Sequence, residues 1–344
     1  MIVREAVRAD DAALLRIESA SSQGDKLGLA EDRFSFFHRA DRFERSIVLV
    51  GENERTGALL GVMAASIVRV RIRGEYRTAA YMFDLRNNPD ASGGLSKALF
   101  VIWKHLERRL KDEGVELLFG YVKKDNSRSL SIVQRMGATS RGMVSHFTIP
   151  VLPPRAVRGT TNVARRIAAA DYRSYLAQRL DDHDLWPHID DSDLLQSVYD
   201  RSVRALITCG SSSALVIDPT CEVRRRVTRM PALYHVAGPL ARSLSRFLPI
   251  PYVPMVGHEM RIWHLMDIIA GSTPAELATV LAEANNMARR DGVHYLAAAA
   301  CPGSPEARAL ARRAVARLDY HVMAVSWADV PTLSKAIYVD PRTL

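Results

Sequence analysis

The residues whose chemistry is easiest to interpret lie at 83–99, where an apolar strand runs through a turn rich in Pro and Gly and opens into a helix. Backbone amides at the start of a helix have no partner within it. The helix dipole adds positive potential at the same point, which suits an anion and most naturally a phosphate. We therefore expect the turn at Gly93 and Gly94 to bind a phosphate group.

A second polar segment, 121–137, strengthens this expectation. Asn126 follows an apolar strand, and the helix after it begins at Ser127 and is closed by Gly137. Asparagine suits the N-cap of a helix, and the same side chain can hydrogen-bond a ligand, so both roles are open. Together, the two segments suggest that the chain binds one particular cofactor.

The elements that position these segments follow from the spacing of apolar residues. The predicted strands of the first half lie at 2–7, 47–51, 57–72, 78–85, 115–122 and 144–151, and helices are predicted from residue 11, at 95–111 and at 127–136. A strand–helix–strand unit requires a parallel pair of strands, whereas short turns join antiparallel ones. The predicted fold class is therefore α/β (α+β), with a mixed, mostly antiparallel sheet, one central parallel pair and helices on both faces.

The C-terminal half repeats this order, beginning with residues 291–296, which echo 113–118. The matching elements are a strand at 262–269, a helix from residue 273, a strand at 294–300, a helix at 307–318 and a strand at 321–326. A linker rich in proline, at 150–159, separates the two halves. We therefore expect a duplicated architecture with two domains, 1–152 and 153–344.

The second copy is expected to be degenerate, because it lacks the residues of the phosphate site. Gly271-Ser272-Thr273-Pro274 stands in place of the two glycines, and Pro274 removes an amide donor. No Asn-x-x-Ser follows its later strand. We expect this half to be structural or to shape a substrate pocket, without a cofactor of its own.

Composition limits the class of protein. The chain has 344 residues, 48% hydrophobic and 25% charged, which is typical of a soluble globular protein with room for two cores. No apolar run is long enough for a membrane helix, and the N-terminus lacks the pattern of a signal peptide. Its three cysteines, Cys209, Cys221 and Cys301, have no metal or redox spacing. We expect a cytoplasmic location, no membrane partner and no bound metal.

The chain is basic, with a formal net charge of +9. Such a charge attracts acidic ligands. The basic residues are scattered, however, and lack the interleaved aromatic side chains of proteins that bind single strands. We therefore do not expect nucleic acid to be a partner.

Residues 78–137 resemble the GNAT acetyltransferase superfamily, whose two motifs lie at a strand–turn–helix and at the strand–helix that follows. The matching residues are Leu85, Asn87, Pro89, Gly94, Ser96 and Leu99 in the first motif, and Asn126, Ser129 and Gly137 in the second. The resemblance covers about residues 1–150. It implies that the central parallel strands splay apart and that acetyl-CoA, the co-substrate, inserts between them.

The resemblance also implies which residues bind acetyl-CoA. In the family, amides of the first motif hold the pyrophosphate, and an asparagine at the position of Asn126 hydrogen-bonds the pantetheine arm. The implied ligands here are Leu85, Asn87, Ser92, Gly93, Gly94, Leu95, Ser96, Lys97, Asn126 and Ser129.

Acetyl transfer to an amine needs further groups. The resemblance implies that a backbone amide near Leu85 polarises the thioester carbonyl. Asp84 is a candidate to accept a proton from the amine or to orient it, with pairing to an arginine as the alternative. Val133 stands where many family members carry a tyrosine. The proton for the leaving thiolate therefore falls to Tyr121, Ser129 or Ser131, or the thiolate leaves directly.

The acceptor is expected to be an amine that lies against the first helix. Residues after that helix either line its pocket or belong to the core: Phe34, Phe36, Phe37, His38 and Arg42. The leading hypothesis is an acetyl-CoA-dependent N-acetyltransferase. The alternatives are a CoA-binding or structural GNAT-like protein without turnover, and an acyltransferase with a longer acyl donor. Free sheet edges would also allow a homodimer.

Overall fold

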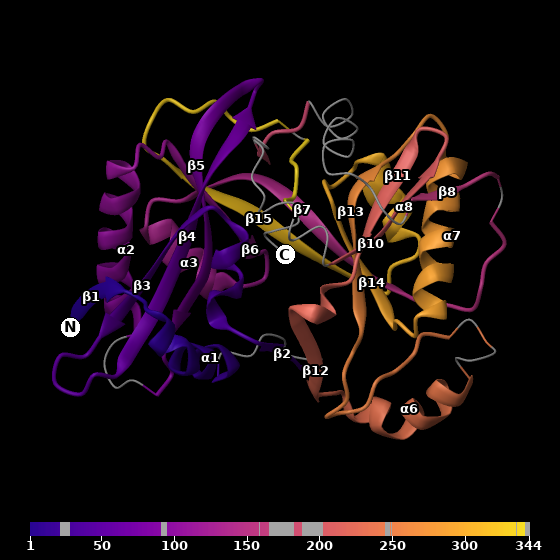
Figure 1. The fold of residues 1–344 in the computed structure, drawn as a ribbon, viewed down its shortest axis with the longest axis horizontal. Coiled ribbons are helices and arrows are strands. Elements are labelled where there is room, and N and C mark those ends of the chain that lie inside the picture. The colour runs from indigo at the N-terminus through magenta and orange to yellow at the C-terminus, as the bar shows by residue number, and fades with distance from the viewer. Residues whose placement is uncertain are drawn as a thin grey trace.

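The computed structural model describes residues 1–20, 28–90, 95–157, 159–164, 182–187, 202–244, 248, 250–334 and 336–340. These residues form two lobes that share one sheet of 13 strands, with a separate two-stranded sheet between the lobes (Figure 1). The large sheet contains both parallel and antiparallel pairs, and helices cover both of its faces. The predicted fold class is confirmed.

The N-terminal half supplies the first seven strands. They are β1 (Ile2–Glu5), β2 (Gly28–Arg33), β3 (Arg45–Glu52), β4 (Leu59–Ile72), β5 (Glu75–Asn87), β6 (Leu117–Lys123) and β7 (Thr139–Pro150). Its helices are η1 (Arg8–Asp10), α1 (Asp11–Ala20), η2 (Phe36–His38), η3 (Ala40–Arg42), α2 (Leu95–Asp112) and α3 (Ser127–Arg135). Strands β1, β3, β4 and β5 pair antiparallel in this order, whereas β5 and β6 pair in parallel, as the sequence predicts.

The helices lie where their apolar residues can be buried. Leu99, Ile102 and Leu106 repeat on one face of α2 and pack on the side of the sheet that holds Leu49 of β3. Leu14 of α1 packs on the opposite side of the sheet. None of the helices in the described residues is both long and apolar enough to cross a membrane.

The C-terminal half repeats the later elements of the first. Its strands are β8 (Asn162–Ala164), β9 (Trp186–Pro187), β10 (Val203–Cys209), β11 (Ser212–Ile217), β12 (Val223–Arg229), β13 (Ile262–Ile269), β14 (Tyr295–Ala300) and β15 (Ala316–Ser326). Its helices are η4 (Pro219–Cys221), α6 (Ala232–Leu244), α7 (Pro274–Arg290) and α8 (Pro305–Ala311). The order β13–α7–β14–α8–β15 matches β5–α2–β6–α3–β7. The division into two domains at residue 152 stays a prediction.

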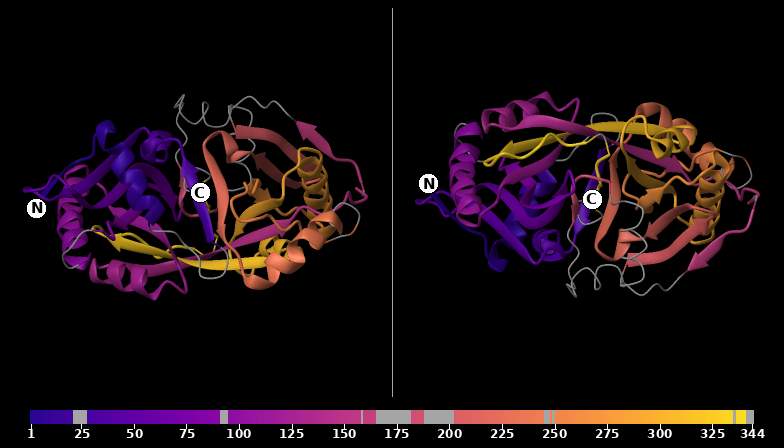
Figure 2. Two further views of the ribbon diagram at one scale, coloured as in Figure 1. Left: turned by 90° about the horizontal axis from the view of Figure 1, so that it is seen from below. Right: turned by 90° about the horizontal axis from the view of Figure 1, so that it is seen from above.

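The two halves exchange their last strands. Strand β15 lies between β6 and β7, and β7 lies between β15 and β14. In Figure 1, both strands run diagonally from one lobe to the other, and Figure 2 shows the yellow β15 extending along the N-terminal lobe. The sheet of the first half is therefore completed by a strand from near the end of the chain.

One predicted helix boundary is wrong. The helix expected at 307–318 ends at Ala311, and residues 316–318 belong to β15. Residues 316–318 pair with β7, where Ala316 lies opposite Thr148, and the pairing with β6 begins at Tyr320. Ladder hydrogen bonds to β7 override the local preference for helix at 316–318.

Candidate active site

The parallel pair β5 and β6 opens into a cavity. Their ladder stops at Tyr81 opposite Phe119, although both strands continue beyond this point. A cavity of about 240 Å³ lies where the pairing ends. Gly120 lines it, and a side-chain carbon added there would meet the backbone oxygen of Met82 at 3.1 Å. Glycine at this position therefore lets β5 and β6 stay close just beyond their last paired residues.

A bulge in β5 shapes one wall of the cavity. The register between β4 and β5 shifts beside Asp84 and Leu85, which have no Cα partners in β4. Asp84 has a φ of 47°, in the left-handed region that Asp and Asn tolerate better than most residues. A bulge bends the strand and turns its side chains, and both residues line the cavity.

The turn after β6 forms another wall. The Oδ1 atom of Asn126 accepts a hydrogen bond from the backbone N–H of Ser129 at 3.0 Å, which caps helix α3. Both residues also line the cavity. Because the cap uses the oxygen of Asn126, its amide nitrogen can still donate to a ligand, and the two roles are compatible. Val133 of α3 is buried on the same wall and cannot donate a proton.

The structure brings part of the predicted site together. The predicted residues that line the cavity are Asp84, Leu85, Tyr121, Asn126 and Ser129. Asn87 lies outside the lining, where its side chain donates to the backbone oxygen of Asn88 at 2.7 Å, and Lys97 is exposed on α2.

The phosphate-binding turn stays a prediction. Ser92, Gly93 and Gly94 lie outside the described residues. Leu95 and Ser96 form the start of α2, of which the backbone alone is described. Helix α2 begins at Leu95, directly after Gly94 in the sequence.

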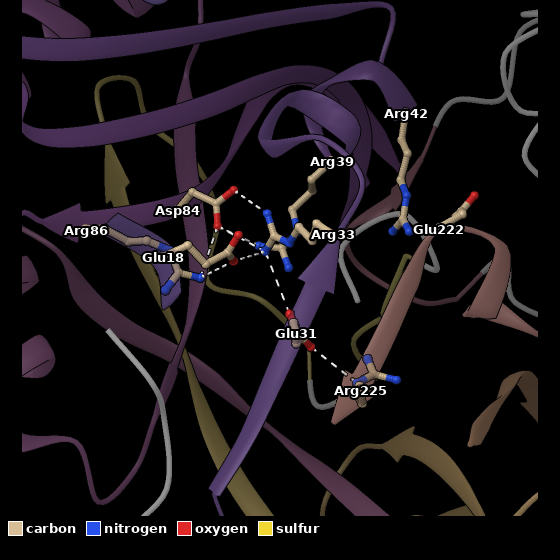
Figure 3. Close-up of polar contacts among 9 residues, drawn as sticks. All are labelled: Glu18, Glu31, Arg33, Arg39, Arg42, Asp84, Arg86, Glu222 and Arg225. Carbon is tan, nitrogen blue, oxygen red and sulfur yellow. Dashed lines mark hydrogen bonds and ion pairs between the residues drawn. The ribbon is translucent and has the colours of Figure 1, made fainter. Parts of the chain in front are cut away.

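Asp84 is enclosed by arginines (Figure 3). Its carboxylate accepts hydrogen bonds from Arg33 at 3.1 and 3.3 Å and from Arg39 at 3.0 Å, and Arg86 lies 3.5 Å away. Burial raises the pKa of Asp84, but the three guanidinium groups outweigh burial and lower this pKa to about 2. Such a carboxylate is a weak proton acceptor. The environment favours the alternative of pairing with arginine, and the role as a base stays a prediction.

The arginines also bind carboxylates from other elements. Glu18 of α1 contacts Arg33 at 2.9 Å and Arg86 at 2.8 Å. Burial raises the pKa of Glu18. Glu31 of β2 contacts Arg225 of β12 at 3.3 Å, across the antiparallel pair that links the two lobes. Charged groups from both halves of the chain therefore meet beside the cavity (Figure 3).

The segment expected to line the acceptor pocket is divided between core and ion pairs. Phe36 and Phe37 are buried in the core, whereas Phe34 is 63% exposed. His38 and Arg42 both contact Glu222, which follows η4 in the C-terminal half. For the two buried rings, the alternative of core packing is the one that the structure favours.

The cavity residues that were missed from the sequence include Arg39 and Tyr320. Arg39 lies between η2 and η3, and its guanidinium carbon is 5.9 Å from the ring centre of Phe83. Tyr320 reaches the cavity because β15 pairs with β6, and its ring lies 4.7 Å from that of His146. Burial raises the pKa of Tyr320, so its hydroxyl keeps its proton. The aromatic and basic residues around Arg39 were a signal for that position, but nothing local points to Tyr320.

The pair β13 and β14 forms a matching opening in the C-terminal half. Its ladder stops at Leu265 opposite Ala298, and Asp267 beyond it has a φ of 48°. Here the C-terminal segment enters the opening, and the hydroxyl of Tyr338 donates to Oδ1 of Asp267 at 2.6 Å. A cavity of about 450 Å³ remains, walled in part by residues 336–339.

The amides before α7 are also occupied. The backbone N–H of Gly271 donates to the hydroxyl of Ser212 at 2.7 Å, and that of Ser272 donates to Ser211 at 3.0 Å. Glu306 of α8 accepts from the amide of Ala270 at 2.8 Å. Groups that would face a phosphate at this helix start therefore have partners within the chain.

Among the described residues, no group of three or more His, Cys, Asp or Glu side chains is placed to hold a metal ion. The three cysteines are free. The expectation that no metal takes part stays a prediction.

Solved structures resemble this chain, although no protein-family model and no curated protein matches it. N-myristoyltransferase from Saccharomyces cerevisiae, solved with bound myristoyl-CoA, has a TM-score of 0.65 at 9% identity, over 98% of this chain and 89% of that one. A GCN5-related N-acetyltransferase from Sphaerobacter thermophilus has a TM-score of 0.53 at 12% identity, over 100% and 98%. Another from Kribbella flavida has a TM-score of 0.51 at 13% identity, over 94% and 70%. At these identities the likeness shows the fold.

Proposed function

Because the chain has the GNAT fold, we propose that it is an N-acyltransferase that takes its acyl group from an acyl-CoA held between β5 and β6. One observation carries this proposal. The parallel ladder stops at Tyr81, and the cavity beyond it is lined by Asn126 and Ser129 of the second motif. The acyl-CoA supplies a thioester carbonyl, which an amine can attack.

The size of the cavity favours acetyl-CoA as the donor. About 240 Å³ between the strands must hold the end of the pantetheine arm as well as the acyl group. A short acyl group fits this space better than a long chain. A longer donor, such as the myristoyl-CoA bound by the yeast enzyme, is the alternative.

The binding residues belong to two segments. In this proposal, the amide nitrogen of Asn126 donates to the pantetheine arm while its oxygen holds the helix cap. The amides from Ser92 to Lys97 bind the pyrophosphate, aided by the dipole of α2. The side chain of Ser129 lies beside Asn126 on the cavity wall.

Charge on the reacting oxygen and proton transfer are assigned to separate groups. The bulge at Asp84 and Leu85 frees backbone from the β4 ladder, and the Leu85 amide is proposed to stabilise the thioester oxygen. A tyrosine hydroxyl, from Tyr121 or Tyr320, donates a proton to the leaving thiolate. Asp84, held by arginines, fixes their positions and leaves removal of the amine proton to water.

Binding and turnover test this proposal separately. Titration calorimetry with CoA should show binding, and thiol release from acetyl-CoA should appear with a panel of amines. Tyr121→Phe and Tyr320→Phe should each leave CoA binding intact, and the variant that removes the proton donor should slow thiol release. The proposal fails if the wild type binds no CoA or releases no thiol with any amine.

A CoA-binding protein without turnover is the second candidate. The observation that favours it is Val133, an apolar residue on the cavity wall where many GNAT enzymes carry a tyrosine. Binding of CoA together with no thiol release would select this candidate.

A further inference from the structure

The ion cluster beside the cavity is not balanced. Around its centre, three guanidinium groups face two carboxylates: Arg33, Arg39 and Arg86 against Asp84 and Glu18. Of the surrounding carboxylates, Glu31 contacts Arg225 at 3.3 Å and Arg33 at 3.8 Å, and Glu222 contacts Arg42. The nine residues of Figure 3 therefore comprise five arginines and four carboxylates, a net charge of +1. An excess charge that is largely shielded from water is costly, so this cluster favours a bound anion.

The excess charge lies at Arg39. The side chain of Arg33 is 2% exposed, and Arg33 contacts both Asp84 and Glu18. Arg39 is 20% exposed and makes one hydrogen bond in the described part of the chain, from Nη1 to Asp84. It also lines the cavity. Its other N–H groups are therefore the donors that a bound anion would meet.

Arg39 lies on the side of the sheet opposite the second motif. It is close to the ring of Phe83, which shares a core cluster with Tyr81. Val133 of α3 packs on the other face. If acyl-CoA lies along α3, Arg39 faces the second substrate.

We infer that the acceptor is an amine that also carries a carboxylate, such as an amino acid or a peptide terminus, and that Arg39 binds this carboxylate. The inference rests on the proposed acyltransferase function. A guanidinium fork matches a carboxylate with two parallel hydrogen bonds, and Arg39 has the donors for such a pair. Asp84 holds Arg39 in place from the other side.

Matched amine pairs test this inference. The probes are phenylalanine with phenethylamine, leucine with 3-methylbutylamine, and a dipeptide with its C-terminal amide. The measured quantity is kcat/KM for thiol release from acetyl-CoA. The wild type should prefer the carboxylate member of a pair by about 10- to 100-fold, the range of one charged hydrogen-bonding contact. Arg39→Met should abolish this preference, and Arg39→Lys should restore part of it.

Controls separate the role of Arg39 from loss of structure. Arg226→Met removes an arginine that is 52% exposed and pairs with Asp32, so it should keep the preference. The KM for acetyl-CoA should not change in Arg39→Met, and thermal melting will confirm that this variant folds, since Asp84 keeps Arg33 and Arg86.

The outcomes distinguish this inference from the proposed function. Thiol release that is equal within the pairs, or greater with phosphoethanolamine than with any amino acid, would overturn the carboxylate subsite and leave the acyltransferase standing. CoA binding with no thiol release from any amine would overturn the acyltransferase. Calorimetry with N-acetyl-phenylalanine would then test the subsite alone. The wild type should bind this compound, and Arg39→Met should not.

Discussion

The two parallel strand pairs of this protein, β5 with β6 and β13 with β14, share a backbone arrangement but differ in the side chains around it. In both, the ladder stops early and an aspartate with a positive φ follows, Asp84 in β5 and Asp267 in β13. Arginines surround the first carboxylate, whereas Tyr338 from the C-terminal segment binds the second. A splayed pair alone therefore does not make a site. The two openings differ in what enters them: the C-terminal segment reaches into the second and leaves a cavity of about 450 Å³ there, whereas arginines border the first.

The starts of helices α2 and α7, which lie beside the two openings, also differ. Ser211, Ser212 and Glu306 occupy the amides before α7. The matching turn before α2 has two glycines in its sequence, and residues 91–94 lie outside the described residues. We therefore expect the first half to bind CoA and the second half to support it.

The largest expected effect comes from the two aspartates. Asp84→Asn keeps the shape and the tolerated φ but removes the negative charge that Arg33, Arg39 and Arg86 share. It should lower the free energy of unfolding by about 3–5 kcal/mol. Asp267→Asn keeps an amide oxygen that can accept from the Tyr338 hydroxyl and loses only the charge of the acceptor, so it should cost about 1 kcal/mol. Urea denaturation of both variants measures the difference, and equal costs would contradict the contrast between the two openings.

The next effect concerns the cavity itself. Ser129→Glu places a charged side chain on the cavity wall and should weaken CoA binding more than about 100-fold, because an unpaired charge there resists burial. Gln134→Glu adds the same carboxylate at an exposed position of α3 and should have little effect. Titration calorimetry measures the CoA affinity of both variants. Equal affinities would show that CoA binds elsewhere.

A smaller effect is expected from the residue that fills the second opening. Tyr338→Phe removes the 2.6 Å hydrogen bond to Asp267 and should lower stability by about 1 kcal/mol. CoA affinity should stay at the wild-type value. If Tyr338→Phe instead bound a second molecule of CoA, residues 336–339 would block a CoA site in the wild type and would not be only structural.

A further expected effect, which both halves share, is a dependence of stability on pH. Burial lowers the pKa of His146 to about 4, and burial likewise lowers the pKa of His294 to about 4. In the unfolded chain these imidazoles gain a proton near pH 6.5. The unfolded state thus binds more protons between pH 6.5 and 4, and the free energy of unfolding falls as pH drops through this window.

Replacing either histidine separates the contributions of the two halves. His146→Gln and His294→Gln should each flatten the pH dependence in urea denaturation. If the free energy of unfolding of the wild type instead rose as the pH was lowered from 6.5 to 4, these histidines would not be buried in the neutral form.

Local patterns in the sequence predict the framework of the site but not all of its contents. Asn126 and Ser129 lie within one strand–helix unit, and the cap that they form is predicted from adjacent residues. Arg33 lies 51 positions from Asp84, and their contact depends on how β2, which pairs with β12, is brought to β5. Tyr320 reaches the cavity through an exchange of strands that no local pattern encodes.

The sequence carries one signal for the bulges in both halves. Asp84 and Asp267 hold matching places in the two copies, each near the end of the strand before a long helix. The repetition of an aspartate in an apolar strand marks the bulge in both halves. It does not reveal that arginines surround one carboxylate and a tyrosine binds the other, because those partners come from distant segments.

A crystal structure of the protein with CoA tests the central claim most directly. The account predicts pantetheine density that passes Asn126 and enters between β5 and β6 beyond Tyr81, with the thiol beside Tyr121 or Tyr320. Density for CoA between β13 and β14, or a gap between β5 and β6 that stays empty at saturating CoA, would contradict it.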